Sequence, residues 1–343
     1  MIFFDVTKSS AIRHRSGLAR MGERLREELG AEAQSGSWTD IRDRAAPNDW
    51  FVTAELFSEE ERPGFAAFIS SGRCRMAAIF ADAIPLKLPK ITWPKSVARH
   101  PGYMKLLSGF ERVWAISRTS RDELLGYWRW LGIQRMPDVQ VLPLGADLSR
   151  VPRSGCRLSA AQQGLLCVGI LEPRKNQLFL LEVAEVLWRS GLIFDLHIVG
   201  RVNPHFGPPT VARIRSLAKK YPGLKYHEAA GDKVLAELYS RVRATVFPTL
   251  AEGCGLPLLE SLWHGVPCVC SDLPVLQENA KGGGCLTPAL NDRSQWSETL
   301  RRILTDDAVH SQLSEAAASR HLPTWTAAAQ RLGEGLGHAT VSS

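Results

Sequence analysis

The stretch Phe247-Pro-Thr-Leu-Ala-Glu-Gly-Cys-Gly-Leu-Pro-Leu-Leu-Glu260 decides the fold of this chain. It begins at the end of an apolar run, Ala244–Thr249, that predicts a buried strand. Pro257 predicts the start of a helix, because the N–H that proline lacks has no partner in a first turn. Between the two, Gly253 and Gly255 let the backbone come close to a ligand. The stretch therefore predicts the ligand-binding end of a strand in a parallel α/β sheet.

Two carboxylates, Glu252 and Glu260, stand on either side of this junction. Glu252 falls in the loop and Glu260 in the first turn or so of the helix, so both can face one cleft. Free N–H groups at a helix start suit an anion, and carboxylates suit a polyhydroxylated ligand that carries a phosphate. The alternative is that both only stabilise the helix start, by up to about 1 kcal/mol each. A dinucleotide fingerprint is excluded, because Gly253-Cys-Gly255 lacks the third glycine and lies late in its domain.

Outward from this stretch, short apolar runs alternate with helical patterns, which predicts α/β domains with mostly parallel sheets. In the first half we expect strands at 1–6, 49–56, 76–80, 112–116 and 139–143, and helices at 18–29 and 120–131. Ser120, three residues before Glu123, predicts a capping box for the later helix. In the second half we expect strands at 165–169, 194–199, 225–228, 244–249 and 267–270, and helices at 178–189, 211–221, 233–241 and 257–263.

The polar segment Asp147–Gln163 has the composition of a linker between two domains. We therefore expect one domain over residues 1–150, a second over 151–322, and a final segment over 323–343 that begins with a helix. Each domain is predicted to be doubly wound, and the ligands of such sheets bind beyond the carboxyl ends of the strands.

Composition limits the class of protein. The 343 residues are 45% hydrophobic and 22% charged, which excludes a disordered chain, and no apolar run approaches the roughly 20 residues of a membrane span. The N-terminus shows no signal-peptide pattern, and seven irregularly spaced cysteines favour the reduced cytoplasm. The net charge of +7 permits an anionic partner. Basic residues interleaved with acids, without an aromatic–basic cluster, argue against nucleic acid.

Five segments in order resemble the retaining glycosyltransferases of the GT-B fold, and more narrowly their group 1 family, which includes many bacterial mannosyltransferases and glycogen synthase. They are Asp82-Ala-Ile-Pro85, Ala115-Ile-Ser117 with Ser120, Val141–Asp147, Val168–Asn176, and Glu252–Glu260 followed by Gly265-Val-Pro267 and Ser271-Asp-Leu-Pro274. The resemblance implies two Rossmann-like domains facing a cleft, with the acceptor bound by the N-terminal domain and a nucleotide sugar by the C-terminal one. It also implies that the final helix, in residues 323–343, crosses back to the N-terminal domain ahead of a frayed tail.

The resemblance also implies roles for particular residues. Glu252 contacts the donor sugar as a catalytic residue, and Glu260 holds the ribose hydroxyls. Arg174 and Lys175 neutralise the diphosphate, which suits the charge that develops on a leaving nucleoside diphosphate. The alternative for this basic pair is a solvated helix start, although two cations there would oppose the helix dipole. Sugar and diphosphate are expected to approach the backbone of Gly253, Cys254, Gly255 and Leu256.

The chain departs from the family pattern at two positions. Ile170 stands where many relatives have an arginine, so that diphosphate contact is either missing or supplied by another residue such as Arg201. Ala81 stands where many have a histidine. Asp82 could still orient the acceptor as a second catalytic residue, or only cap a turn. Gly17 resembles the end of a family loop that passes near donor and acceptor, or it simply starts a helix.

The predicted function is transfer of a sugar with retention, with mannose from GDP-mannose favoured because the Glu-Pro-Arg-Lys-Asn loop resembles mannosyltransferases. The acceptor is expected to be a glycan or lipid-linked glycan of bacterial polysaccharide or lipopolysaccharide biosynthesis. The expected location is the cytoplasm, with a peripheral membrane position left open. No cofactor and no metal are expected, since no Asp-x-Asp loop is present and Cys268 and Cys270 fit a buried strand. The alternatives are a sugar-nucleotide epimerase of the same fold and a non-catalytic binder of nucleotide sugar or nucleic acid.

Overall fold

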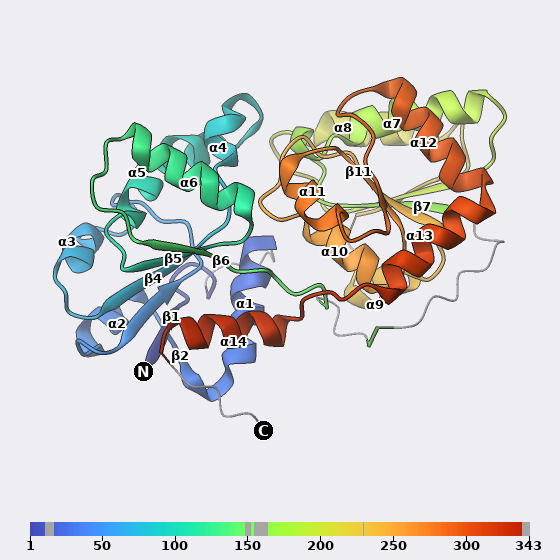
Figure 1. The fold of residues 1–343 in the computed structure, drawn as a ribbon. Coiled ribbons are helices and arrows are strands. Elements are labelled where there is room, and N and C mark those ends of the chain that lie inside the picture. The colour runs from blue at the N-terminus through green and yellow to red at the C-terminus, as the bar shows by residue number, and fades with distance from the viewer. Residues whose placement is uncertain (11–16, 148–151, 154–163, 229, 338–343) are drawn as a thin grey trace. The chain divides into compact units, whose positions relative to one another are not determined.

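The computed structural model describes residues 1–10, 17–147, 152–153, 164–228 and 230–337, and it divides the chain into two compact units (Figure 1). The first unit comprises Met1–Gly145 together with the segment from Pro323, and the second comprises Ala146–Leu322. Each unit holds one parallel six-stranded sheet, so the predicted α/β class is confirmed. Most of the expected linker lies outside the described residues.

The sheet of the first unit has the strand order β2-β1-β3-β4-β5-β6. Its strands are β1 (Ile2–Asp5), β2 (Ala33–Gly36), β3 (Trp50–Thr53), β4 (Arg75–Phe80), β5 (Arg112–Ala115) and β6 (Asp138–Val141). Its helices are α1 (Gly17–Leu29), α2 (Trp38–Arg44), α3 (Phe65–Ser70), α4 (Ile84–Lys87), α5 (Pro94–Leu107), α6 (Arg118–Trp130) and α14 (Trp325–Gly335), with short 3₁₀ turns η1 (Gly30–Glu32) and η2 (Pro89–Ile91).

Helices cover both faces of this sheet, with α5 and α6 on one face and α1 and α14 on the other (Figure 1). The strands β1 and β3 are therefore buried along their whole length, as in other parallel sheets. Tight packing holds the returning helix α14 in place. A Cβ on Gly145 would lie 2.3 Å from the backbone N of Trp325, so this position accepts no side chain. Trp50 Nε1 also donates to the carbonyl of Leu336 at 2.7 Å.

The sheet of the second unit has the strand order β12-β11-β10-β7-β8-β9. Its strands are β7 (Gly164–Val168), β8 (Asp195–Val199), β9 (Leu224–His227), β10 (Ala244–Phe247), β11 (Cys268–Cys270) and β12 (Cys285–Leu286). Its helices are α7 (Gln177–Arg189), α8 (Pro208–Ala218), α9 (Asp232–Tyr239), α10 (Leu256–Trp263), α11 (Pro274–Ala280), α12 (Arg293–Thr305) and α13 (Asp307–Ser319), with a 3₁₀ turn η3 (Pro173–Lys175).

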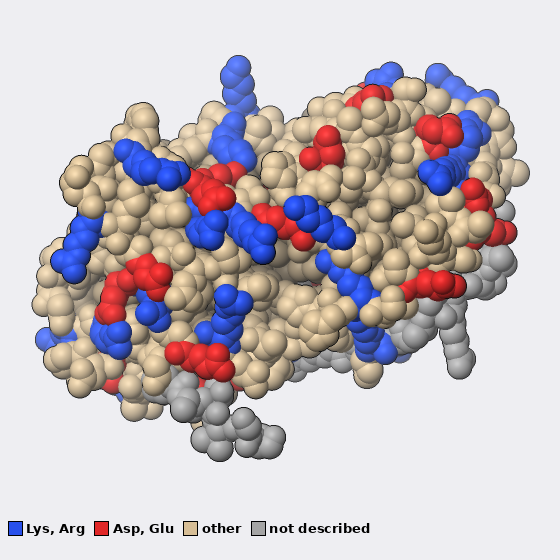
Figure 2. Space-filling view, viewed as in Figure 1, with Lys and Arg blue, Asp and Glu red and all other residues tan. Residues whose placement is uncertain are grey.

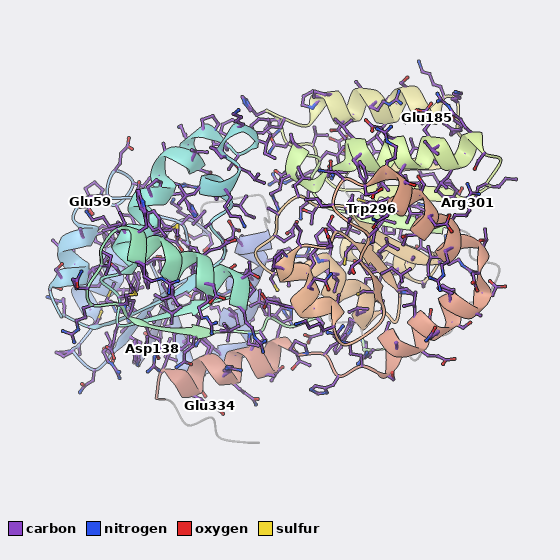
Figure 3. The ribbon with its side chains drawn as sticks, turned by 45° about the horizontal axis from the view of Figure 1, so that its top comes forward. Glu59, Asp138, Glu185, Trp296, Arg301 and Glu334 are labelled. Atoms are coloured by element: carbon purple, nitrogen blue, oxygen red, sulfur yellow. The ribbon has the colours of Figure 1, made fainter. Side chains whose placement is uncertain are left out.

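The core of the second unit lies between the sheet and the helices α7, α8 and α12. Trp296 on α12 is fully buried there (labelled in Figure 3). Its ring meets Phe179 of α7 edge-on at 5.8 Å, and its Nε1 donates to the carbonyl of Ala289 at 3.0 Å. An aromatic side chain that also satisfies its polar atom anchors α12 to the sheet.

Both sheets reverse their strand order once. In the first unit the reversal lies between β1 and β3, and in the second it lies between β7 and β10. Ligands of doubly wound sheets bind at the carboxyl ends of the strands at this switch point. The loops after these four strands are therefore where a functional site is expected.

Two local predictions differ from the structure. The helix α6 is capped by Ser117, whose side chain accepts a hydrogen bond from the Ser120 N–H, so Ser120 is not the predicted N-cap. The edge strands β2 and β12 were not predicted, because one is the weakly apolar Ala-Gln-Ser-Gly and the other has two residues. The side chains of Cys268 and Cys270 are buried in β11, as small apolar side chains would be.

Candidate functional site

The switch point of the second sheet brings together two loops that are distant in sequence. Leu250 N–H donates to the carbonyl of Arg174 at 2.8 Å, and the Thr249 hydroxyl oxygen lies 3.1 Å from the same carbonyl oxygen. These contacts hold the turn after β7 against the loop after β10. The predicted basic pair and the predicted Glu252 therefore lie in contact.

One carboxylate oxygen, Glu252 Oε1, is the centre of this contact. It accepts hydrogen bonds from Lys175 Nζ at 2.7 Å, from Arg174 Nη1 at 3.0 Å and from the Thr249 hydroxyl at 2.7 Å. The Glu252 side chain is only 9% exposed. Burial raises the pKa of this carboxyl, but the charges of Lys175 and Arg174 outweigh burial and bring the pKa below its usual value. Glu252 is therefore ionised at neutral pH.

Both cations are held as tightly as the carboxylate. Lys175 is 10% exposed and its Nζ lies 4.9 Å from the centre of the Phe247 ring, and burial lowers its pKa although Glu252 raises it. Arg174 donates from Nε and Nη2 to Glu172 Oε1, at 3.1 and 2.8 Å. Asn203 Nδ2 in turn donates to Glu172 Oε2 at 3.2 Å. The two glutamates and two cations form a charge-balanced cluster.

This cluster changes one argument made from the sequence. Arg174 and Lys175 lie in the turn η3 before α7, and carboxylates of the chain itself supply their anions. An anionic ligand is therefore not needed to explain two cations near a helix start. Their contact with a diphosphate stays a prediction, and such a ligand would compete with Glu252 for both.

The glycine-containing loop leads into α10 with a backbone that requires glycine at one place. Gly255 has a φ of 84°, and a Cβ there would lie 2.5 Å from Leu276. Cys254 is buried, its carbonyl accepts from Asn279 Nδ2 at 2.7 Å, and burial raises the pKa of its thiol to about 12. Cys254 therefore contributes a fixed backbone, not a reactive thiolate. Leu256 is the first residue of α10, and Gly253 is buried beside Cys254 in the loop.

Glu260 lies in the second turn of α10, deeper than the first turn that the sequence suggested. Its side chain is buried and accepts a hydrogen bond from Tyr239 Oη at 3.3 Å. The Tyr239 ring stacks on His264 at 4.5 Å. His264 is the residue that caps the C-terminal end of α10, and burial lowers its pKa. No motif in the sequence indicated Tyr239.

Arg201 lies beside the position where the family arginine is absent. Leu171 N–H donates to the Arg201 carbonyl at 2.9 Å, and a bridge between Leu171 and Val202 extends the pairing of β7 with β8. Gly200 permits this approach, because a Cβ there would lie 2.0 Å from the Gly169 carbonyl oxygen. The Arg201 side chain is exposed, and its guanidinium makes no hydrogen bond or ion pair with the described residues.

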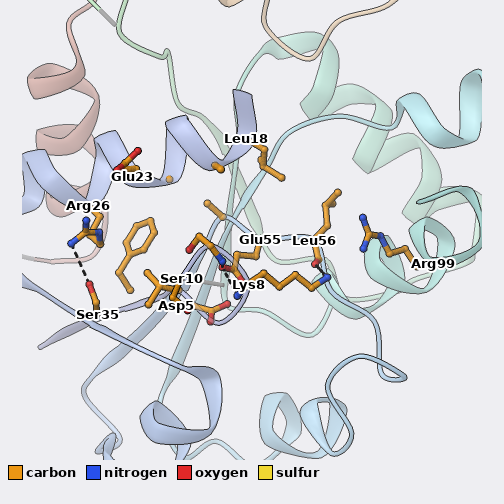
Figure 4. A pocket seen from close by; sticks show the side chains of 16 residues that line it. Asp5, Lys8, Ser10, Leu18, Glu23, Arg26, Ser35, Glu55, Leu56 and Arg99 are labelled. Carbon is orange, nitrogen blue, oxygen red and sulfur yellow. Dashed lines mark hydrogen bonds between the residues drawn. The ribbon is translucent and has the colours of Figure 1, made fainter. Parts of the chain in front are cut away.

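The switch point of the first sheet holds a cavity of about 730 Å³ (Figure 4). Two of the residues that line it, Asp5 and Glu55, belong to an ion cluster: Arg62 donates to Asp5 at 2.8 Å and to Glu55 at 2.5 Å, and Arg62 is 1% exposed. Glu55 also accepts from the backbone N–H of Lys8 and of Ser9, at 2.8 and 2.7 Å. The cluster fixes the loop after β1. Its walls include both apolar and charged side chains, among them Phe4, Leu18, Glu23, Arg26, Leu56 and Arg99.

Two residues expected at a site lie elsewhere in the first unit. Asp82 follows β4, where its Oδ1 accepts from the Ile84 N–H at 3.0 Å, so it does cap a turn. Its carbonyl bonds to His100 Nε2 at 2.9 Å, and burial lowers the pKa of His100 to about 4. Gly17 is the first residue of α1, with open space around a Cβ, just before cavity-lining Leu18.

Among the residues that the structure describes, no group of three or more His, Cys, Asp and Glu side chains is arranged to hold a metal ion. The roles predicted for Asp82, Gly17 and the Glu252 loop stay predictions. Sequence reasoning missed Lys8, Glu55 and Arg62, which belong to no motif and meet only in the folded unit.

Comparisons with known proteins show what this chain is similar to. Residues 162–306 match the family described as Glycosyl transferases group 1. The serotype-specific mannosyltransferase WbdA of Escherichia coli is 29% identical over 249 residues, which cover 67% of this chain and 30% of that protein. Sucrose-phosphate synthase from Thermosynechococcus elongatus is 17% identical with a TM-score of 0.68, over 97% of both chains. HepE of Anabaena, solved with UDP and glucose, is 13% identical with a TM-score of 0.67, over 98% of this chain and 99% of that one.

The two parallel sheets and these structural neighbours define a protein of the GT-B fold, as the sequence predicted. The second unit of the chain resembles the group 1 glycosyltransferase family, whose model it matches over most of its length. The chain spans about a third of the length of the curated mannosyltransferase that it matches.

Proposed function

We propose that this chain is a glycosyltransferase that moves a sugar from a nucleotide donor to a glycan or lipid-linked glycan, with retention at the anomeric carbon and without a metal ion. The observation that carries the proposal is the buried, ionised Glu252 at the switch point of the second sheet. A fixed anion of this kind stands ready for a reaction in which positive charge appears on the donor sugar.

Glu252 is suited to this role because its environment is set before a donor arrives. Two cations and one hydroxyl fix a single carboxylate oxygen, so little reorganisation is needed as the glycosidic bond breaks. The positive charge on the ring would be stabilised by the carboxylate. The departing diphosphate would be stabilised by Lys175 and Arg174, with exposed Arg201 on the neighbouring loop as a third cation.

The favoured donor is GDP-mannose. Support comes from the similarity to WbdA, a mannosyltransferase, and from the resemblance of the Glu-Pro-Arg-Lys-Asn loop to mannosyltransferases. Glu260 would bind the ribose of this donor. The acceptor would enter the cavity of the first unit, where apolar walls and polar groups alternate as a sugar ring requires. The setting would be polysaccharide or lipopolysaccharide biosynthesis in the bacterial cytoplasm.

A panel of nucleotides tests the proposal. A ligand at a hundred times its dissociation constant stabilises the folded state by about 2.7 kcal/mol, so GDP and GDP-mannose should raise the melting temperature more than UDP and UDP-glucose. NMR of the product formed on a synthetic mannoside should show the anomeric configuration of the donor, with turnover surviving EDTA. Release or epimerisation of the sugar without an acceptor would favour an epimerase. A chain that binds none of these nucleotides would refute the proposal.

A further inference from the structure

The segment that follows β4 has an unusual charge pattern. From Ala83 to Phe110 the chain contains no Asp or Glu, although the whole sequence has 35 of them in 343 residues, about one in ten. The same segment contains five cations: Lys87, Lys90, Lys95, Arg99 and Lys105. It folds as the short helix α4, the turn η2 and the helix α5. Figure 2 shows basic side chains over the region of α4 in the first unit.

Within this segment, the residues Lys90, Trp93 and Lys95 form a patch, here called the Trp93 patch. Trp93 is 43% exposed, which is unusual for a tryptophan, and a lysine lies on either side of it. Both lysines are exposed, and their ammonium groups make no hydrogen bond or ion pair with the described residues. By contrast, Lys87 pairs with Glu123 and Arg99 with Glu61. Of the three lysines of this segment that have no such partner, two therefore lie within three residues of the exposed ring, and the third, Lys105, lies at the far end of α5.

The patch is held rigidly on the first unit. The inner face of α5 is anchored by His100, Tyr103, Met104 and Leu107, all of them buried. Prolines at the start of η2 and of α5 restrict the backbone on both sides of Trp93. A ligand that meets this patch does not have to order it first, which lowers the entropic cost of binding.

We propose that the Trp93 patch docks the protein on a membrane surface rich in anionic lipid. Tryptophan favours the boundary between headgroups and acyl chains, and lysine keeps its ammonium group in water while its stem lies along apolar surface. Leu88 and Ile91, a few residues before Trp93 in the sequence, are half-buried and add apolar area for shallow insertion. A nucleic acid would call for several stacking rings and free arginines, and the arginine of this segment is already paired.

The docking is expected to be peripheral and reversible. In the described part of the chain, no helix has both the length and the apolar character needed to cross a bilayer. A few lysines and one ring give a contact that salt weakens, because charges at a surface are screened within about 10 Å at 0.1 M salt. The inference rests on this surface alone, so it stands or falls independently of the sugar transfer proposed above.

Sedimentation of the full chain with vesicles tests the inference. The chain should co-sediment with phosphatidylcholine vesicles that contain phosphatidylglycerol, much less with phosphatidylcholine alone, and less with either as NaCl is raised. Each lysine near an anionic surface contributes about fivefold to binding, so reversing one charge in Lys90→Glu should weaken it by roughly 30-fold. Trp93→Ser should also weaken binding to the anionic vesicles. It should weaken the residual binding to neutral vesicles by a similar factor, because the ring contributes no charge.

Matched variants on the second unit serve as controls. Lys219→Glu reverses an exposed lysine that also lacks a partner among the described residues, and Ile193→Ser removes an apolar side chain that is 83% exposed. Both should bind vesicles like the parent, and all four variants should keep its melting temperature. An equal loss of vesicle binding in Lys219→Glu and Lys90→Glu would overturn the inference. So would a parent protein that does not bind anionic vesicles. Binding to a generic oligonucleotide that Lys90→Glu abolishes would assign the patch to nucleic acid instead.

Discussion

At the switch point of the first sheet two carboxylates share one guanidinium, whereas at that of the second sheet two cations share one carboxylate oxygen. Asp5 and Glu55 both bind Arg62, which is almost inaccessible. Glu252 binds both Lys175 and Arg174, and 9% of its side chain is still exposed. The two arrangements occupy the same place in two sheets of the same kind.

The difference lies in what the charges do. In the first unit they bind backbone N–H groups and hold a loop, which leaves a cavity above them for a ligand. In the second unit they face each other across two loops, and both cations are paired with an anion of the chain itself. The same sheet topology can therefore carry either a cavity or a buried ion cluster at its switch point, depending on which side chains follow the strands.

The largest effect is expected from a substitution that breaks the ion cluster of the first unit. Arg62→Met leaves Asp5 and Glu55 buried without their cation, which should cost about 3–5 kcal/mol of unfolding free energy in a urea titration. Lys225→Met is the control, because its pair with Asp195 is half exposed and should be worth about 1 kcal/mol or less. Equal losses in the two variants would show that the first cluster is not a structural anchor.

The next effect tests whether the second cluster exchanges its anion. Lys175→Met should weaken binding of nucleoside diphosphate by roughly tenfold to hundredfold, the worth of one charge-assisted hydrogen bond of about 1.5–3 kcal/mol. Titration calorimetry with GDP measures it, and Lys220→Met, an exposed lysine of the same unit, is the control. A Lys175 variant that binds GDP as tightly as the parent would leave the cluster with a purely structural role.

A smaller effect is expected at Arg201. Its side chain is exposed and unpaired among the described residues, so Arg201→Ala should leave the melting temperature unchanged while weakening GDP binding by about tenfold. Arg215→Ala on α8, also exposed, should change neither quantity. If Arg201→Ala binds GDP normally, Arg201 does not take the place of the arginine that many relatives have at the position of Ile170.

The smallest effect is the pH dependence of stability. The pKa of Glu252 is lower in the folded protein than its usual value of 4.5, because its two cations outweigh burial. Glu252 therefore adds stability at neutral pH that is lost as the pH falls below that value and through the folded pKa. In urea titrations at several pH values, Glu252→Gln should lose less stability than the parent on acidification. Parallel curves for the two proteins would contradict this assignment.

Much of this architecture could be predicted from the sequence. Strands such as β7 and β10 are continuous apolar runs because both faces of a parallel sheet are covered, and the loop after β10 carries glycines for a steric reason at Gly255. The edge strands β2 and β12 could not be predicted, since they are short and one is largely exposed. Patterns of apolar residues carry little information where little is buried.

The site was predictable only in part. The sequence singled out Glu252, Lys175 and Arg174 separately, but their salt bridges join residues 77 and 78 positions apart, and only the switch point brings them together. It gave no sign of Arg62, whose partner Asp5 lies 57 positions away at the end of β1. Local patterns identify which residues are available, whereas the strand order decides which of them meet.

Steady-state kinetics of Glu252→Gln tests the central claim most directly, namely that the second cluster is the donor site and Glu252 its catalytic carboxylate. Turnover of GDP-mannose should fall by roughly 100- to 1,000-fold, the worth of one preorganised electrostatic contact in a transition state. Binding of GDP should be at least as tight as in the parent, because Lys175 and Arg174 lose their internal anion. Glu182→Gln, at an exposed pair on α7, should behave like the parent in both respects. A Glu252→Gln variant with normal turnover would contradict the claim.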